Sequence, residues 1–173
     1  AVIGARGVVG RACIHELEAQ GVSTIALRRG DSIPEQLGGI IVASEIEDFE
    51  FDGILVDCTR GLQNCELALP NIRATAHHRI RIPNCMASLI AQALHSIRIH
   101  CNIETIVATT MQSASGAGWR GVQALEKQCA EEIFRGTLNH NVLVHERAEQ
   151  EELAIEEDLN TIFNCDVTAT TFR

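Results

Sequence analysis

Short apolar runs bounded by glycine and polar residues recur along the first third of the chain, and this pattern predicts strands. The runs cover residues 1–3, 22–27, 39–44 and 53–58. Between the first two, Val9, Cys13 and Leu17 recur at every fourth position, which is typical of a helix face, and Gly21 is well suited to end that helix. Strands that alternate with helical segments predict parallel βαβ units.

The most regular helical pattern follows residue 84. Its apolar positions have the i, i+3, i+4, i+7, i+8 spacing of one helix face: Met86, Leu89, Ile90, Ala93, Leu94 and Ile97. Asn84 precedes them as a natural N-cap, and Pro83 restricts how the chain enters the helix. Further along we expect strands at 104–110 and 166–173, helices at 119–134 and 149–158 with Leu153, Ile155 and Leu159 apolar, and a candidate strand at 141–145.

Composition narrows the function classes. The chain is 46% hydrophobic but only 3% aromatic, with no tyrosine, so we expect an aliphatic core and no stacking platform for single-stranded nucleic acid. A net charge of −9 argues against nucleic acid and anionic membranes as partners. Apolar runs are too short for a membrane span. Seven cysteines without CxxC pairs or zinc spacing predict reduced thiols, no metal site and a cytoplasmic protein.

Three glycines follow the first predicted strand. Gly4, Gly7 and Gly10 form GxxGxxG, which permits a tight turn into a helix whose free N–H groups can receive a pyrophosphate. The motif alone fits a strand-to-helix turn without a ligand equally well.

Two arginines follow the second predicted strand. An NAD site has an acidic residue at this point for the ribose hydroxyls, whereas this chain has Arg28 and Arg29, whose guanidinium groups suit the 2′-phosphate of NADP. A solvated arginine pair is the alternative, and the nearby Asp31 keeps NAD open.

Cys85 is the strongest candidate nucleophile. It begins a capped helix, where the helix dipole and free N–H groups stabilise a thiolate and are expected to lower the pKa of the thiol. A small buried hydrophobic residue is the alternative role of any cysteine. We expect that role for five others, Cys13, Cys58, Cys101, Cys129 and Cys165.

The remaining candidate site residues are polar residues near the ends of predicted helices and strands. Gln112 ends a strand just before a loop of small residues, 113–118, and is placed to hold a carbonyl or water. Glu151 and Arg173 also lie near element ends, although periodicity alone predicts that both are solvated. The seven histidines have poor ligand spacing, and we expect them to be structural or exposed.

Together these segments resemble the aspartate-semialdehyde dehydrogenase family. Residues 4–10, Gly-Ala-Arg-Gly-Val-Val-Gly, are similar to the family's Gly-Ala-Thr-Gly-x-Val-Gly, and residues 83–85 match its Pro-Asn-Cys. Residues 110–118, Thr-Met-Gln-Ser-Ala-Ser-Gly-Ala-Gly, are similar to its Thr-Tyr-Gln-x-x-Ser-Gly-Ala-Gly. The family's Glu-Glu helix and its strand ending in Arg look like residues 151–152 and 168–173.

The resemblance implies an α/β protein. Residues 1–84 would form a Rossmann-type dinucleotide-binding domain, and residues 85–173 an α+β catalytic and dimerisation domain, incomplete here. It implies NADPH-dependent reductive dephosphorylation of L-aspartyl 4-phosphate to L-aspartate 4-semialdehyde, a step of lysine, methionine and threonine biosynthesis, in a homodimer or tetramer.

The resemblance also implies residue roles. Cys85 would attack the acyl phosphate and form a thioester, and Gln112 would orient the acyl group. Glu151 would hold the substrate ammonium, Arg173 its carboxylate through two parallel hydrogen bonds, and Asn84 would contribute to substrate binding. The implied cofactor-binding residues are Gly4, Gly7, Val8, Val9, Gly10, Arg28, Arg29, Ser115, Gly116 and Gly118.

The chain also departs from the family. The family's acid/base histidine lies shortly beyond the arginine that Arg173 matches, so we expect it outside this chain. Its phosphate-binding arginine lies in a stretch that is shorter here, where Arg73, Arg79 and Arg81 have no clear match. We therefore expect missing segments. The alternatives are a non-catalytic binding or assembly subunit and a related acyl-phosphate or acyl-CoA reductase, among which N-acetyl-glutamyl-phosphate reductase shows Gly-Cys rather than Asn-Cys.

Overall fold

The computed structural model describes residues 1–127, 131–134, 136–138 and 140–173. They form two compact units, Ala1–Ile82 and Pro83–Arg173. The boundary expected from the sequence, between residues 84 and 85, falls just inside the second unit. Among the described helices, none has the length and apolar character needed to cross a membrane.

The first unit is built on a six-stranded sheet in which every pairing is parallel and the strand order is β2-β1-β3-β4-β6-β5. The strands are β1 (Val2–Ile3), β2 (Ala26–Leu27), β3 (Gly39–Val42), β4 (Ile54–Asp57), β5 (Glu66–Leu67) and β6 (Arg79–Arg81). The expected parallel α/β architecture is confirmed. The sequence did not reveal β5 and β6, because one has two residues and the other alternates arginine with a single isoleucine.

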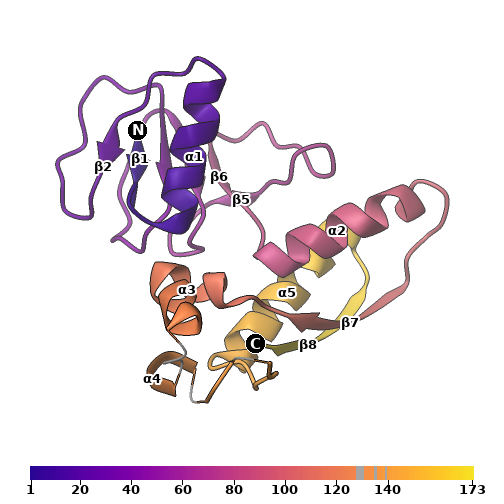
Figure 1. The fold of residues 1–173 in the computed structure, drawn as a ribbon. Helices are drawn as coiled ribbons and strands as arrows, with labels where there is room; N and C mark the ends of the chain where they lie inside the picture. The colour runs from indigo at the N-terminus through magenta and orange to yellow at the C-terminus, as the bar shows by residue number, and fades with distance from the viewer. Residues whose placement is uncertain (128–130, 135, 139) are drawn as a thin grey trace. The chain divides into compact units, whose positions relative to one another are not determined.

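One helix, α1 (Val8–Ala19), joins β1 to β2, and it is the only helix within residues 1–82, all of which are described (Figure 1). Gly10 is buried and Cys13 and Leu17 are half-buried, so its inner face follows the expected period. Val9 was expected on that face but is 47% exposed, because Gly10 takes the place nearest the sheet. Gly21 has the positive φ of 76° that ends the helix, as predicted.

The core of the first unit lies on the sheet. Its buried members are aliphatic, as the composition predicts: Ile3, Leu27, Ile40, Val42, Leu55 and Leu62. Half-buried residues of the connecting loops, including Phe49 and Phe51, pack against them. The crossovers after β2 and β3 are therefore irregular segments that still bury apolar side chains.

The second unit contains a parallel pair of strands, β7 (Thr105–Met111) and β8 (Asp166–Phe172), in register from Thr105↔Asp166 to Met111↔Phe172. Two longer helices, α2 (Cys85–Arg98) and α5 (Ala148–Phe163), pack against each other, and α5 packs on β8 (Figure 1). The shorter elements are η1 (Ala114–Ala117), α3 (Gly118–Glu126) and α4 (Glu131–Phe134).

Three expected elements differ in the second unit. The single helix expected at 119–134 is divided into α3 and α4, and residues 128–130 lie outside the described part. The candidate strand at 141–145 is only an antiparallel bridge, Val144↔Phe172. The helix expected at 149–158 is longer, because α5 runs on to Phe163 and buries Ile162 with Leu159.

The buried faces of the two longer helices were predicted incorrectly in part. In α2 the fully buried positions are Ala87 and Ala91, whereas Leu89 is 60% and Ile97 50% exposed. Leu153 of α5 is likewise 51% exposed. These helices carry apolar residues on more than one side, so spacing alone could not identify the side that packs.

The cysteines that were expected in the core differ in how far they are buried. Cys165 is buried as predicted, while Cys13 and Cys58 are half-buried. Cys101 is exposed, because it follows the end of α2 in a turn, so its assignment to the core was wrong. Cys129 lies outside the described residues.

Candidate functional site

Cys85 is the first residue of α2, and its backbone position is fixed by Asn84. The Asn84 side-chain oxygen accepts the N–H of Met86 at 2.8 Å, which is the predicted N-cap. The Asn84 backbone N–H donates to the fully buried carboxylate of Asp158 at 2.7 Å. The start of α2 is thus tied to α5, and Cys85 stands exposed beside that junction.

Glu151 of α5 accepts hydrogen bonds from two other predicted site residues. Its Oε2 accepts the Asn84 Nδ2–H at 2.8 Å and the Gln112 Nε2–H at 3.0 Å. Gln112 is buried at the end of β7, and its backbone N–H donates to Phe172 in β8 at 2.8 Å. One carboxylate therefore holds together the residue before Cys85, the end of β7 and helix α5.

Gly116 in η1 lies against two of these side chains. A Cβ added there would stand 2.9 Å from Nη1 of Arg173 and 3.3 Å from Oε1 of Gln112. Its missing side chain lets both groups approach the loop backbone. Ser115 is exposed and its hydroxyl bonds that of Ser113, while Gly118 has a φ of 71°.

Arg173 is only 5% exposed, and its guanidinium group is bound by other parts of this unit. Nε and Nη2 donate to the two oxygens of Glu146, at 2.9 and 2.7 Å, in a bidentate pair. Nη1 donates to the Ser113 carbonyl at 2.7 Å, Nη2 lies 2.6 Å from Nε2 of His145, and the guanidinium carbon lies 5.1 Å from the centre of the Phe134 ring.

The structure therefore groups the predicted residues Asn84, Cys85, Gln112, Glu151 and Arg173. The same contacts reveal two partners of Arg173 that were not predicted as site residues, Glu146 and His145. His145 is buried, and from the sequence it was expected only to be structural or exposed. No spacing pattern could have identified Glu146, because its partner Arg173 is far along the chain.

The pKa of the Cys85 thiol is raised above its usual value, contrary to the expectation from its helix position. Desolvation of the sulfur is the larger cause, although the residue as a whole is exposed, and the charge of Glu151 is the next. The N–H groups of Cys85 and Met86 and the charge of Arg173 lower the pKa, but by less. Cys85 therefore rests as a thiol in this arrangement.

Two groups around Arg173 also have shifted pKa values. Burial, and then the charge of Arg173, lower the pKa of His145, so its imidazole is neutral at pH 7. Burial alone would raise the pKa of Glu146, but the hydrogen bonds from Arg173 and from its own N–H lower it. The cluster is therefore an ion pair with a neutral imidazole beside it.

In the first unit, the predicted glycine loop lies where β1 ends. Gly4 has a φ of 83°, and a Cβ on Gly10 would stand 2.3 Å from the Gly4 carbonyl oxygen, so both positions require glycine. Gly7 is the N-cap of α1, and Val8 and Val9, in its first turn, are exposed. This helix end can receive an anion.

The loop also occupies the place in the sheet where such ligands bind. In the strand order, β1 lies between β2 and β3: the chain passes from β1 to β2 on one side and then crosses over to β3 on the other. The carboxyl ends of strands at such a switch point form the crevice that binds nucleotides in open α/β sheets. Gly4 packs against Ser44, just after β3, at this point.

The predicted arginines follow β2. Arg28 and Arg29 are exposed. The Asp31 carboxylate accepts the backbone N–H of Arg28 at 2.8 Å and so closes its own turn. This contact favours Asp31 as a turn residue rather than a ribose ligand.

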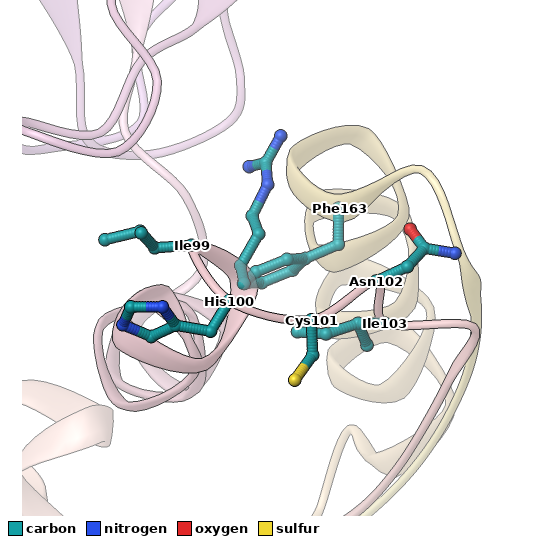
Figure 2. A pocket seen from close by; sticks show the side chains of 7 residues that line it. Ile99, His100, Cys101, Asn102, Ile103 and Phe163 are labelled. Carbon is teal, nitrogen blue, oxygen red and sulfur yellow. The ribbon is translucent and has the colours of Figure 1, made fainter.

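A separate depression of about 390 Å³ lies at the other end of α2 (Figure 2). It is lined by Arg98, Ile99, His100, Cys101, Asn102, Ile103 and Phe163. Arg98 donates to the Ile162 carbonyl at 2.8 Å, and its guanidinium carbon lies 5.4 Å from the centre of the Phe163 ring. None of the predicted site residues lines this depression.

Solved structures with a similar fold are aspartate-semialdehyde dehydrogenases. Aspartate semialdehyde dehydrogenase II from Vibrio cholerae complexed with ASA has a TM-score of 0.77 and 20% sequence identity, and the match covers 99% of this chain and 68% of that one. A probable aspartate-semialdehyde dehydrogenase from Pseudomonas aeruginosa has a TM-score of 0.78 and 15% identity, with the same coverage of both chains. No family model and no curated protein sequence matches the chain.

This chain has the fold of the aspartate-semialdehyde dehydrogenases. The resemblance drawn from the motifs is thereby confirmed at the level of fold. Several expectations stay predictions: the use of NADP, a thioester intermediate, the roles of the residues, homo-oligomer formation and a cytoplasmic location.

Proposed function

We propose that the protein catalyses the NADPH-dependent reductive dephosphorylation of L-aspartyl 4-phosphate to L-aspartate 4-semialdehyde. The observation that supports this most is the contact of Glu151 with both Asn84 and Gln112, beside an exposed cysteine at a helix start. A nucleophile, an amide and a carboxylate that can hold an ammonium group are thus gathered within one unit.

The covalent step belongs to Cys85. Its sulfur forms a bond to the acyl carbon, the carbon–oxygen bond to phosphate breaks, and phosphate leaves with that electron pair. Because the pKa of the thiol is raised, its proton must pass to a base before attack. Gln112 orients the acyl oxygen, and Glu151 holds the substrate ammonium.

The glycine loop and the arginines of the first unit fit NADPH. Gly4 and Gly10 shape a turn that brings the N-terminus of α1 to the switch point, and Arg28 and Arg29 are exposed for a 2′-phosphate. Bound NADPH supplies the hydride that reduces the acyl group to the aldehyde. The engagement of Asp31 in its own turn favours NADP over NAD.

The reverse reaction gives a direct test in the full-length protein. Aspartate 4-semialdehyde, phosphate and NADP should yield NADPH, measured by its absorbance. Cys85→Ala should abolish turnover, while Cys101→Ala, at an exposed cysteine away from the site, should retain it. No turnover by the wild type, or turnover that survives Cys85→Ala, would overturn the proposal.

A further inference from the structure

Resting on the proposed function, we infer that Glu146 occupies the carboxylate subsite of Arg173 in the free protein and yields it to the α-carboxylate of the substrate. The Nε and Nη2 groups of Arg173 donate to the two oxygens of Glu146 at 2.9 and 2.7 Å. A substrate carboxylate would use the same edge of the guanidinium and the same two parallel hydrogen bonds. The free and bound states therefore differ by the exchange of one carboxylate for another.

Arg173 has other contacts that keep its guanidinium in place during such an exchange. Nη1 donates to the Ser113 carbonyl at 2.7 Å, and the guanidinium carbon lies 5.1 Å from the centre of the Phe134 ring. The main chain of Arg173 is fixed by two backbone hydrogen bonds with Leu143. The edge that faces Glu146 can therefore accept a second carboxylate without rebuilding the loop around it.

This guanidinium lies beside the groups that are proposed to bind the rest of the substrate. A Cβ added to Gly116 would stand 2.9 Å from Nη1 of Arg173 and 3.3 Å from Oε1 of Gln112, so both side chains meet at the same glycine. Gln112 donates in turn to Glu151, the proposed ammonium ligand. The charge of Arg173 also acts to lower the pKa of the Cys85 thiol. One amino-acid substrate can therefore reach the carboxylate, ammonium and acyl subsites together.

Glu146 is the partner that is placed to move. It lies in the short segment between the Val144 bridge and the start of α5, and its side chain is 18% exposed, whereas that of Arg173 is 2% exposed. Removing the carboxylate from a buried arginine without a replacement is strongly unfavourable. Glu146 should therefore leave only when another carboxylate takes its place, which makes it a specificity-determining residue.

The exchange has opposite consequences for affinity and for stability. The substrate binds only the fraction of the protein in which the pair with Glu146 is open, and this reduces its apparent affinity. Glu146→Gln removes the competing charge and leaves the guanidinium with a weaker partner. The free variant should therefore be less stable than the wild type, yet bind a carboxylate more tightly. If Glu146 only held Arg173 in position, the same substitution would weaken binding.

L-asparagine and 3-aminopropanamide test this without turnover, because they differ only in the α-carboxylate. In the full-length protein, calorimetry should show that Glu146→Gln binds L-asparagine about tenfold more tightly than the wild type does, the effect expected of a charged hydrogen bond. The affinity for 3-aminopropanamide should stay within about twofold. L-asparagine should also raise the unfolding temperature of this variant by more than that of the wild type. Glu149→Gln, which removes an exposed carboxylate of α5, should behave as the wild type does.

Glu146→Asp is the second variant, for use if Glu146→Gln does not fold. It keeps the charge on a shorter side chain, so its affinity for L-asparagine should rise by a smaller factor. Weaker or unchanged binding of L-asparagine by a folded variant would overturn the inference, and so would a lack of binding by every form of the protein.

Turnover of aspartate 4-semialdehyde distinguishes failure of this inference from failure of the proposed function. If the wild type does not oxidise it but Glu146→Gln binds L-asparagine more tightly, the inference stands and the reaction is wrong. If the wild type does oxidise it and Glu146→Gln raises its KM, the reaction stands and the inference is wrong. When both hold, the KM for aspartate 4-semialdehyde should fall in Glu146→Gln by about the factor found for L-asparagine.

Discussion

At the scale of single residues, Glu151 contributes to the charge around Cys85. It accepts hydrogen bonds from Asn84 and Gln112, and its charge is one of the causes that raise the pKa of Cys85. Glu151→Gln removes that charge and keeps a side chain of nearly the same shape, so we expect the pKa of the Cys85 thiol to fall. The rate of alkylation of Cys85 by iodoacetamide, followed by mass spectrometry across pH, should rise at lower pH than in the wild type.

The matched variant for this test is Glu149→Gln, which changes an exposed carboxylate in the first turn of the same helix. It should leave the alkylation profile of Cys85 unchanged. If both variants give the wild-type profile, Glu151 does not control the thiol, and burial alone accounts for its raised pKa.

His145 gives a prediction for the dependence of stability on pH. The pKa of His145 is lowered in the folded protein. As the pH falls below about 6.5, the unfolded chain therefore takes up a proton on this histidine before the folded protein does. The contribution of His145 to the free energy of unfolding should therefore be fully present above that pH and should decrease as the pH falls toward the pKa of the folded state. The contribution of Glu146, whose pKa is also lowered, is present above about 4.5 and is lost only at lower pH.

Thermal unfolding at pH 7.5 and 5.5 measures this effect. The wild type should lose stability between the two values, and His145→Gln should lose less. In NMR titrations the His145 ring should titrate below an ordinary histidine pKa. A His145 resonance that titrates at about 6.5 would contradict the prediction.

The sequence predicted part of this site because some of its residues follow local rules. Asn84 was identified as an N-cap from its place before an apolar helix, and Cys85 follows from that position. The pKa of Cys85 was predicted in the wrong direction, because desolvation and Glu151 act through tertiary contacts. Glu146 was missed for the same reason, since its partner Arg173 lies in another element.

At the scale of elements, α5 stabilises the outer edge of β8 through two glutamates. Glu152 accepts the N–H of Thr171 at 3.0 Å, and Glu156 accepts the N–H of Ala169 at 2.8 Å. The glutamates are four positions apart on a helix and the amides two apart on a strand, so both pairs meet on one side. Part of the acidic run in the sequence therefore covers backbone donors of a strand.

Glu156→Ala should destabilise the second unit by about 1–3 kcal/mol, because it leaves the N–H of the buried Ala169 without an acceptor. Glu156→Gln keeps an acceptor oxygen and should lose less. Chemical denaturation followed by circular dichroism measures the change, with the exposed Glu149→Ala as control. An equal loss in Glu156→Ala and Glu149→Ala would show that this hydrogen bond contributes nothing.

Element types were easier to predict than packing faces. Short apolar runs with a glycine at one end identified β1, β3 and β4, because buried parallel strands are apolar on both faces. The inner sides of α2 and α5 were less predictable, since Leu89 and Leu153 continue an apolar spacing on exposed sides. Only the partner surface determines which of two apolar stripes is buried.

At the scale of the whole molecule, the two compact units carry different predicted tasks. The glycine loop and arginines suited to NADP lie in residues 1–82, and the groups around Cys85 lie in residues 83–173. The net charge of −9 repels polyanions in general, whereas Arg28 and Arg29 are two exposed positive charges at the end of β2, where we propose that the 2′-phosphate binds. Cofactor affinity and acyl chemistry should therefore respond to separate substitutions.

Replacing Arg28 and Arg29 together by glutamine should weaken NADPH binding by about tenfold or more, because charged hydrogen bonds to the 2′-phosphate are lost. NADH lacks that phosphate, so its affinity should change by less than about twofold. Cys85→Ala provides the reciprocal case, since it should leave NADPH affinity intact while it abolishes turnover. Fluorescence titration of the full-length protein with each nucleotide measures both effects. Equal losses for NADPH and NADH would mean that the arginines support the fold of the loop, and an unchanged NADPH affinity would mean that the 2′-phosphate binds elsewhere.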